Sequence, residues 1–97
     1  MLILQTLARG KPLHGFEIAE SIQQTSEDVL QVEEGSLYPA LQRMLIKGLI
    51  SGDWGKTAEN RRARYYRPTA QGRSHLDQEL AKYRRVAAAI ARILAPA

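Results

Sequence analysis

The chain has 97 residues, of which 44% are hydrophobic, so it has room for one modest core and is most simply a single domain without a large substrate cleft. The sequence contains no cysteine, which excludes disulfides and thiolate zinc sites and fits a reducing cytoplasm. Its net charge of +4 suits a polyanionic partner, whereas its apolar runs are far shorter than the roughly 20 residues that span a bilayer. We therefore expect a cytoplasmic protein that does not use a membrane.

Two short helices are predicted at the start of the chain. An apolar stripe begins at Leu2 and is broken at Gly10, and because no capping residue precedes it we expect this helix to start upstream. A second helix is predicted over residues 15–24, where apolar side chains recur on one face. Residues 25–34 are polar, and we interpret them as a loop with at most one strand residue.

A third helix is predicted from the spacing of Leu37, Leu41 and Met44, which places these side chains on one buried side. Gly48 suits the end of this helix, and Pro39 is tolerated only near its start, where backbone amides lack intrahelical partners. The side opposite the buried stripe carries Ser36, Pro39, Gln42, Arg43, Ile46 and Lys47.

A β-hairpin is predicted next, with strands over residues 49–54 and 63–67 and a polar tip over 55–62. Trp54 is interpreted as a strand residue that packs on the hairpin or on the last helix. Positions 56–67 of the hairpin are strongly basic, because Lys56, Arg61, Arg62, Arg64 and Arg67 are accompanied there by a single acid, Glu59. A basic hairpin can lie along a phosphate backbone or enter a minor groove, although a charge run of this kind can also be a solvated face.

A long C-terminal helix is predicted after Thr69, which is a suitable N-cap. Its apolar residues recur at alternating spacings of four and three, as in a heptad seam, at Leu76, Leu80, Tyr83, Ala87, Ile90 and Leu94. The seam can belong to the domain's own core, but it is too long for that alone, and we interpret it as a dimer interface. We therefore expect a mainly α (α+β) fold, with residues 1–68 as one domain and residues 69–97 as a dimerisation helix packed on it.

The order of three helices, a hairpin and a long helix carries a family resemblance. The segments 13–18 (LHGFEI), 35–44 (GSLYPALQRM), 47–50 (KGLI) and 64–72 (RYYRPTAQG) together resemble the PadR family of bacterial transcription regulators. The resemblance implies a winged helix-turn-helix, a C-terminal helix used for dimerisation, and repression of a nearby promoter. Because the chain has room for only one terminal helix, it is similar to the short form of the family.

The resemblance also implies a set of DNA-binding residues. On the recognition helix these are Ser36, Tyr38 and Pro39, and on the wing they are Asn60, Arg61, Arg62 and Arg64. Gln42, Arg43 and Lys47 are added because they lie on the side of the same helix that faces away from the core. Tyr38 can pack at the edge of the core or contact DNA with its hydroxyl, and both readings stay open. Glu33 and Glu34 stand where the family often has a small residue and a proline, and two carboxylates there would repel phosphates.

The expected partners are double-stranded DNA with an inverted-repeat operator and a second copy of the chain. The resemblance adds a small-molecule effector as an option, although no residue identifies one. We expect no enzymatic activity, because no phosphate loop, nucleophile elbow or dinucleotide fingerprint is present. We also expect no cofactor and no metal, since His14 and His75 lie far apart without suitable companions. The alternative is a winged helix that contacts proteins or RNA.

Overall fold

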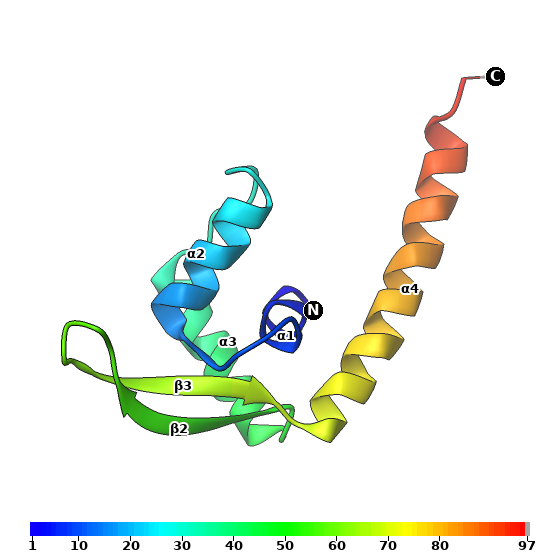
Figure 1. The fold of residues 1–97 in the computed structure, drawn as a ribbon. Coiled ribbons are helices and arrows are strands. Elements are labelled where there is room, and N and C mark those ends of the chain that lie inside the picture. Colours follow the sequence, from blue (N-terminus) through cyan, green and yellow to red (C-terminus); the bar gives the residue numbers. More distant parts are fainter. Residues whose placement is uncertain (97) are drawn as a thin grey trace.

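The computed structural model describes residues 1–96 and shows a small body from which one long helix extends (Figure 1). Among these residues the elements follow the order α1 (Leu2–Ala8), β1 (Leu13–His14), α2 (Gly15–Thr25), α3 (Glu34–Ile46), β2 (Ile50–Lys56), β3 (Arg62–Pro68) and α4 (Ala70–Leu94). The predicted α+β winged-helix class is therefore confirmed. The division at residue 68 stays a prediction, and residue 97 of the second part lies outside the described residues.

The core lies where the three short helices meet the sheet and the start of α4. Each short helix supplies apolar side chains at helical spacing, and β2, β3 and α4 add one buried hydrophobic side chain each. The buried hydrophobic residues are Leu4, Leu7, Ile18, Ile22, Leu37, Leu41, Leu49, Ile50, Tyr66 and Leu76. Because burial of each large apolar side chain stabilises the fold by about 1.5–3 kcal/mol, this cluster fixes the relative positions of α2, α3 and the hairpin.

The sheet of the described residues has three antiparallel strands in the order β1, β3, β2. The hairpin strands reach further than predicted, with Lys56 opposite Arg62, so the tip is only residues 57–61. The tip is closed by Thr57, whose amide donates to the Arg61 carbonyl at 2.8 Å. Strand β1 was not predicted, because a pair of residues is too short to show an alternating pattern. It places the start of α2 beside β3.

The predicted loop before α3 is present over residues 26–33, contains no strand residue, and includes Glu27 and Asp28 with φ of 52° and 66°. The prediction about Pro39 needs correction. Helix α3 already begins at Glu34, so Pro39 lies in its second turn and not at its start. The prediction that a proline is tolerated only where amides lack intrahelical partners is therefore wrong here. The helix proceeds without the hydrogen bond that this amide would have donated to Gly35.

The end of α3 and the start of α4 are joined by a compact set of hydrogen bonds. Gly48, with φ of 74°, donates to the Leu45 carbonyl at 3.1 Å and ends α3 as predicted. Thr69 is the predicted N-cap of α4, and its hydroxyl accepts from the Gly72 amide at 3.0 Å. The same hydroxyl donates to the Gly48 carbonyl at 2.6 Å, and the Thr69 amide donates to the Leu49 carbonyl at 3.1 Å.

Gly72→Ala should strongly destabilise the fold. A Cβ on this buried residue would overlap the Leu49 carbonyl group, which is backbone and cannot move aside. We expect a loss of about 3 kcal/mol or more in the free energy of unfolding, measured by denaturant titration. Gly35→Ala is the matched control, because a Cβ there meets nothing within 4 Å in helix α3, and it should be neutral or stabilising. Equal stabilities for the two variants would contradict the close packing described above.

Candidate nucleic-acid interface

One face of α3 is free of contacts with the core and is available to a partner. Leu37 and Leu41 are buried, whereas all residues predicted to lie on the opposite side are exposed. These exposed residues are Ser36, Pro39, Gln42, Arg43, Ile46 and Lys47. Ile46, the last residue of α3, is a large apolar side chain of this otherwise mainly polar face and is 80% exposed.

Tyr38 packs at the edge of the core and is partly exposed. Its ring lies against Gly15 at the start of α2, where a Cβ would come within 3.1 Å of three of its side-chain atoms. The side chain nevertheless remains 49% exposed. Packing therefore fixes the ring, and the exposed part is accessible to a partner.

The hairpin carries positive charge that is not paired with acidic side chains. Arg67 pairs with Asp53 across the two strands. None of the ion pairs within residues 1–96 involves Arg61, Arg62 or Arg64. These three guanidinium groups are thus free to meet an anionic partner.

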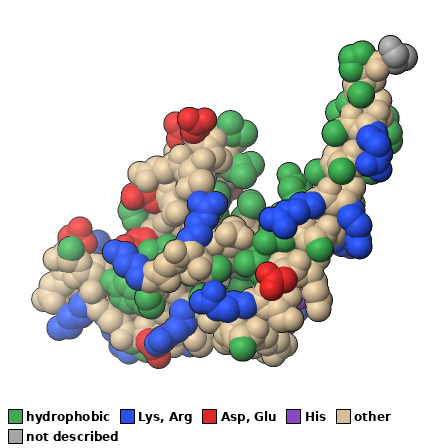
Figure 2. Space-filling model, turned by 45° about the vertical axis from the view of Figure 1, so that its right-hand side comes forward, with side chains coloured by type: hydrophobic (Ala, Val, Ile, Leu, Met, Phe, Trp, Pro, Cys, Tyr) green, Lys and Arg blue, Asp and Glu red, His purple; other side chains and the backbone are tan. Residues whose placement is uncertain are grey.

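Charged side chains are unevenly distributed over the molecule (Figure 2). Lys and Arg side chains lie along the lower part of the body and along α4, and separate acidic side chains lie among them. Acidic side chains also mark the far end of α2, where Glu27 and Asp28 are exposed, so a polyanion is repelled from that end.

A recess between α3 and the hairpin brings together four of the predicted DNA-binding residues. It has a volume of about 400 Å³, and we call it the wing recess. Its lining includes Tyr38 and Gln42 from α3 and Arg62 and Arg64 from β3, and it contains no Asp or Glu. The remaining lining residues are His14, Gly15, Phe16, Trp54, Ala63 and Tyr66. Positive charge, aromatic rings and the absence of carboxylates are the features that a nucleic acid strand requires.

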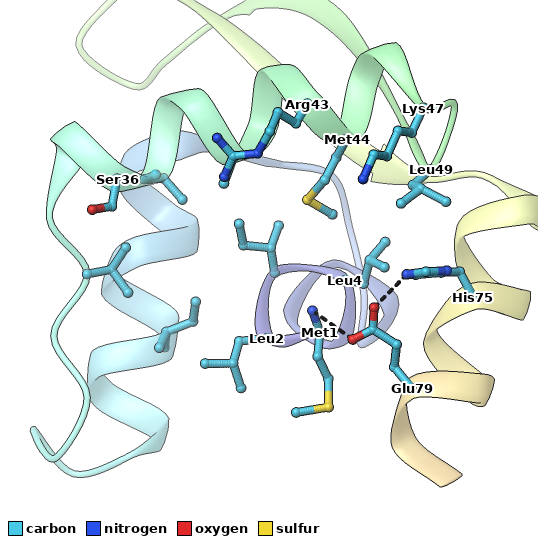
Figure 3. A pocket seen from close by; sticks show the side chains of 15 residues that line it. Met1, Leu2, Leu4, Ser36, Arg43, Met44, Lys47, Leu49, His75 and Glu79 are labelled. Atoms are coloured by element: carbon cyan, nitrogen blue, oxygen red, sulfur yellow. Dashed lines mark ion pairs between the residues drawn. The ribbon is translucent and has the colours of Figure 1, made fainter. Parts of the chain in front are cut away.

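Three other predicted residues, Ser36, Arg43 and Lys47, line a different hollow between α1, α3 and α4 (Figure 3). This α4 hollow has a volume of about 470 Å³. Figure 3 shows Arg43 and Lys47 coming from α3 on one side and Glu79 bonded to His75 on the other. The predicted DNA-binding residues of α3 are thus divided between two hollows. Pro39 lies on the exposed face and lines neither, and Asn60 and Arg61 lie at the hairpin tip.

The predicted seam of α4 divides into two parts. Leu76 is buried in the core of the same chain, and Leu80 is half-buried against that core. The later members remain accessible: Tyr83, Ile90 and Leu94 are exposed and Ala87 is partly exposed. Val86 and Ile93 are also exposed apolar residues of this half of α4. Their helical spacing relative to Ile90 could have added them to the predicted seam.

Trp54, His14, Phe16 and Tyr66 are candidate site residues that sequence reasoning did not assign. Trp54 is 60% exposed and packs on the hairpin, as predicted, with the Arg62 guanidinium 4.3 Å from its ring centroid. His14 caps α2, since its Nδ1 accepts from the Glu17 amide at 3.4 Å. Its place in the wing recess follows from strand β1, for which the sequence offered no signal.

Burial raises the pKa of Tyr66 above its ordinary value of 10.0, because the phenolate is poorly solvated there. The Arg64 guanidinium opposes this effect by favouring the phenolate, and Tyr38 adds to it. The charges of Arg64 and Tyr38 therefore influence the ionisation of Tyr66 in the wing recess.

Within residues 1–96, none of the helices is both long and apolar enough to cross a membrane. The same residues contain no cluster of three or more His, Asp or Glu that could hold a metal ion.

Comparison with known proteins connects this arrangement to one family. The model of the transcriptional regulator PadR-like family matches residues 3–78. A transcriptional regulator from Clostridium thermocellum superposes with a TM-score of 0.86 at 26% identity, over 97% of this chain and 90% of that one. A PadR family transcription regulator from Clostridium difficile superposes with a TM-score of 0.80 at 28% identity, over 97% and 95% of the two chains.

A structure of Bacillus subtilis PadR in complex with operator DNA shares the fold. It superposes with a TM-score of 0.72 at 22% identity, over 81% of this chain and 43% of that one. A protein of uncharacterised function from Lysinibacillus sphaericus is 29% identical over 76 residues, which is 78% of this chain and 70% of that protein.

Tyr66→Phe should reduce the loss of stability at high pH. Because the folded-state pKa is raised, this residue's contribution to the free energy of unfolding is fully present below pH 10 and is lost as the pH rises through the raised value. Denaturant titrations from pH 8 to 11.5 should therefore show a shallower decline for the variant. An unchanged decline in Tyr66→Phe would contradict the burial argument.

Proposed function

Because the chain belongs to the PadR-like family of transcriptional regulators, we propose that it is a sequence-specific DNA-binding repressor that acts as a homodimer. The observation that carries the proposal is the wing recess, where the exposed face of α3 meets unpaired arginines of the hairpin without a carboxylate in the lining. Chromosomal DNA as the partner implies a cytoplasmic location.

The proposed DNA contacts follow from the shapes of the two elements. The exposed face of α3 suits the major groove, which admits a helix and distinguishes all four base pairs. The hairpin, with Asn60 and Arg61 at its tip and Arg62 and Arg64 behind it, suits the phosphate backbone or the minor groove. That a regulator of the same fold, Bacillus subtilis PadR, has been solved with operator DNA supports this proposal.

The proposed dimer rests on the second half of α4. Tyr83, Val86, Ile90, Ile93 and Leu94 are at least about half exposed, and an apolar face of this length is rarely left in water. A symmetric pairing through these residues presents two recognition helices to half-sites about one helical turn, or a multiple of it, apart. The operator is then an inverted repeat.

The proposal also includes relief of repression by a small molecule. The α4 hollow supports it, because its floor is largely apolar whereas Arg43 and Lys47 stand at its rim. These two residues also belong to the exposed side of α3. A ligand bound there would therefore compete for side chains that we assign to DNA.

The alternative function, a winged helix that contacts proteins or RNA, is less well supported. A hairpin depleted of free positive charge would favour it. Here Arg61, Arg62 and Arg64 form no ion pairs within residues 1–96.

Substitutions in the hairpin and in α3 should affect DNA binding differently. Arg61→Ala or Arg62→Ala should weaken binding to operator and scrambled duplexes alike, and should lower the slope of log K against log salt by roughly one. At least one of Gln42→Ala and Arg43→Ala should cost on the order of 1–3 kcal/mol on the operator and leave scrambled DNA nearly unaffected.

The measurement is a salt titration with an operator selected from random duplexes and its scrambled counterpart. Arg92→Ala, at an exposed position in the last turn of α4, is the control for loss of a single positive charge. If the hairpin variants alone lose discrimination and the α3 variants shift both duplexes equally, the assigned roles are wrong.

Ile90→Glu should dissociate the dimer. The residue lies in the exposed apolar half of α4, where a buried unpaired carboxylate would destabilise an interface by several kcal/mol. Light scattering at micromolar concentration should show a dimer for the wild type and a monomer for the variant. Ala88→Glu, exposed on the opposite side of the same helix, should stay dimeric. A monomeric wild type, or a dimeric Ile90→Glu variant, would exclude this interface.

A further inference from the structure

Trp54 lies at the centre of a row of side chains on one face of the hairpin. It pairs with Arg64 across the two strands, and the next pair on the same face is Lys56 and Arg62. The Arg62 guanidinium lies 4.3 Å from the indole centroid, and the Arg64 guanidinium lies 5.9 Å from it. Both distances fall within the range of attraction between a cation and an aromatic face.

The Arg64 side chain runs across the strand next to Gly52. A Cβ on Gly52 would lie 2.6 Å from Nε of Arg64, so only a glycine leaves room for this path. Nε is buried and forms no hydrogen bond within the described residues. Packing against Gly52 and Trp54, and not a hydrogen bond at Nε, therefore fixes the direction of the Arg64 side chain.

The face that carries these side chains is the one that lines the wing recess. Trp54, Arg62 and Arg64 all border it, opposite Tyr38 and Gln42 of α3. Because neither arginine forms an ion pair within residues 1–96, the recess presents two uncompensated guanidinium groups in a fixed arrangement. A ligand with negative charge and apolar sugar surface, as in a strand of DNA, matches this lining.

We propose that Trp54 is a positioning residue for DNA binding, whose indole holds the Arg62 and Arg64 guanidinium groups toward the wing recess so that one backbone strand of the duplex binds between the hairpin and α3. The inference rests on the proposed DNA-binding function, to which it adds the role of Trp54 and the position of the bound backbone strand. A long arginine side chain loses rotamer freedom when it binds a phosphate. If Trp54 has ordered the two side chains beforehand, less of that loss accompanies binding.

Trp54→Leu removes the aromatic face and keeps an apolar side chain. It should weaken binding to any duplex roughly 3-fold to 10-fold, because the two arginine side chains then lose more rotamer freedom when they bind. The slope of log K against log salt should stay at the wild-type value, because both positive charges remain. Trp54→Phe keeps an aromatic face and should recover most of the affinity. Because Trp54 is 60% exposed, thermal melting should be close to wild type for both variants.

A double-mutant cycle separates positioning from direct contact. In a chain with Arg62→Ala and Arg64→Ala, the further change Trp54→Leu should cause no additional loss, since Trp54 acts through these two residues. Phe16→Leu is the matched control, because Phe16 is a similarly exposed aromatic residue of the same recess without a guanidinium over its ring. Its effect should be the same in both backgrounds.

Fluorescence gives a readout that a merely structural role would not change. Trp54 is the sole tryptophan of the chain, so its emission reports on this place alone. Addition of a duplex to the wild-type protein should alter the emission, and Arg62→Ala with Arg64→Ala should alter the emission of the free protein.

The outcomes distinguish this inference from the function on which it rests. Absence of DNA binding by the wild type at low salt overturns the proposed function and this inference with it. Wild-type binding that Trp54→Leu leaves unchanged overturns the inference alone. An equal loss from Trp54→Leu in the presence and absence of the two arginines also overturns it, because the indole would then contact DNA by itself. Loss in the wild-type background only, with recovery by Trp54→Phe, supports it.

Discussion

The hydrogen bonds of Thr69 hold the parts of this molecule in their relative places. Its hydroxyl bridges the Gly48 carbonyl at the end of α3 and the Gly72 amide at the start of α4, while its amide binds the Leu49 carbonyl before β2. Three elements that perform different tasks thus start or end within one small set of contacts. Since Gly72 permits the backbones to touch, α4 cannot shift along α3 without opening this junction.

This junction connects the helix proposed for dimerisation, α4, to the elements proposed for DNA binding, α3 and the hairpin. The direction of α4 decides how far apart a dimer built on Ile90 and its neighbours places its two copies of α3. The start of β2 decides where the hairpin stands beside α3. A fixed junction therefore sets both the spacing between half-sites and the width of the wing recess, although neither Thr69 nor Gly72 is one of the proposed DNA-binding residues. A substitution of Thr69 or Gly72 would weaken recognition because it moves the DNA-binding elements, not because it removes a contact with DNA.

Much of the fold could be predicted because its signals are local. The spacing of Leu37 and Leu41 marked the buried side of α3, and Gly48 and Thr69 marked helix ends whose chemistry lies in single residues. The early start of α3 at Glu34 was missed, because a helix that accommodates Pro39 in its second turn needs support from surrounding packing. Strand β1 was missed for a related reason: pairing with β3 defines it, and no pattern of its own does.

The candidate site was predictable as a list of residues but not as an arrangement. Helical periodicity identified the exposed side of α3, yet only tertiary packing divides that side between the wing recess, which includes Gln42, and the α4 hollow, which includes Arg43. The seam of α4 likewise reads as one stripe in sequence, although Leu76 belongs to the core and Ile90 does not. Periodicity gives the direction of a side chain around its own helix, whereas the neighbour it meets depends on contacts distant in sequence.

Charge at the two ends of the interface acts in opposite directions. Glu33 and Glu34 begin α3 without capping it through a side chain, so their carboxylates favour the positive end of the helix and repel nearby phosphates. The hairpin arginines attract phosphates at every sequence, and such attraction alone raises binding to all DNA equally. Repulsion at the start of α3 lowers the affinity for DNA of any sequence. A base contact from the exposed side of α3, in contrast, forms only with the bases of the operator. On the proposed function, the two glutamates therefore lower the affinity for operator and random DNA alike, and discrimination between the two depends on base contacts from the exposed side of α3.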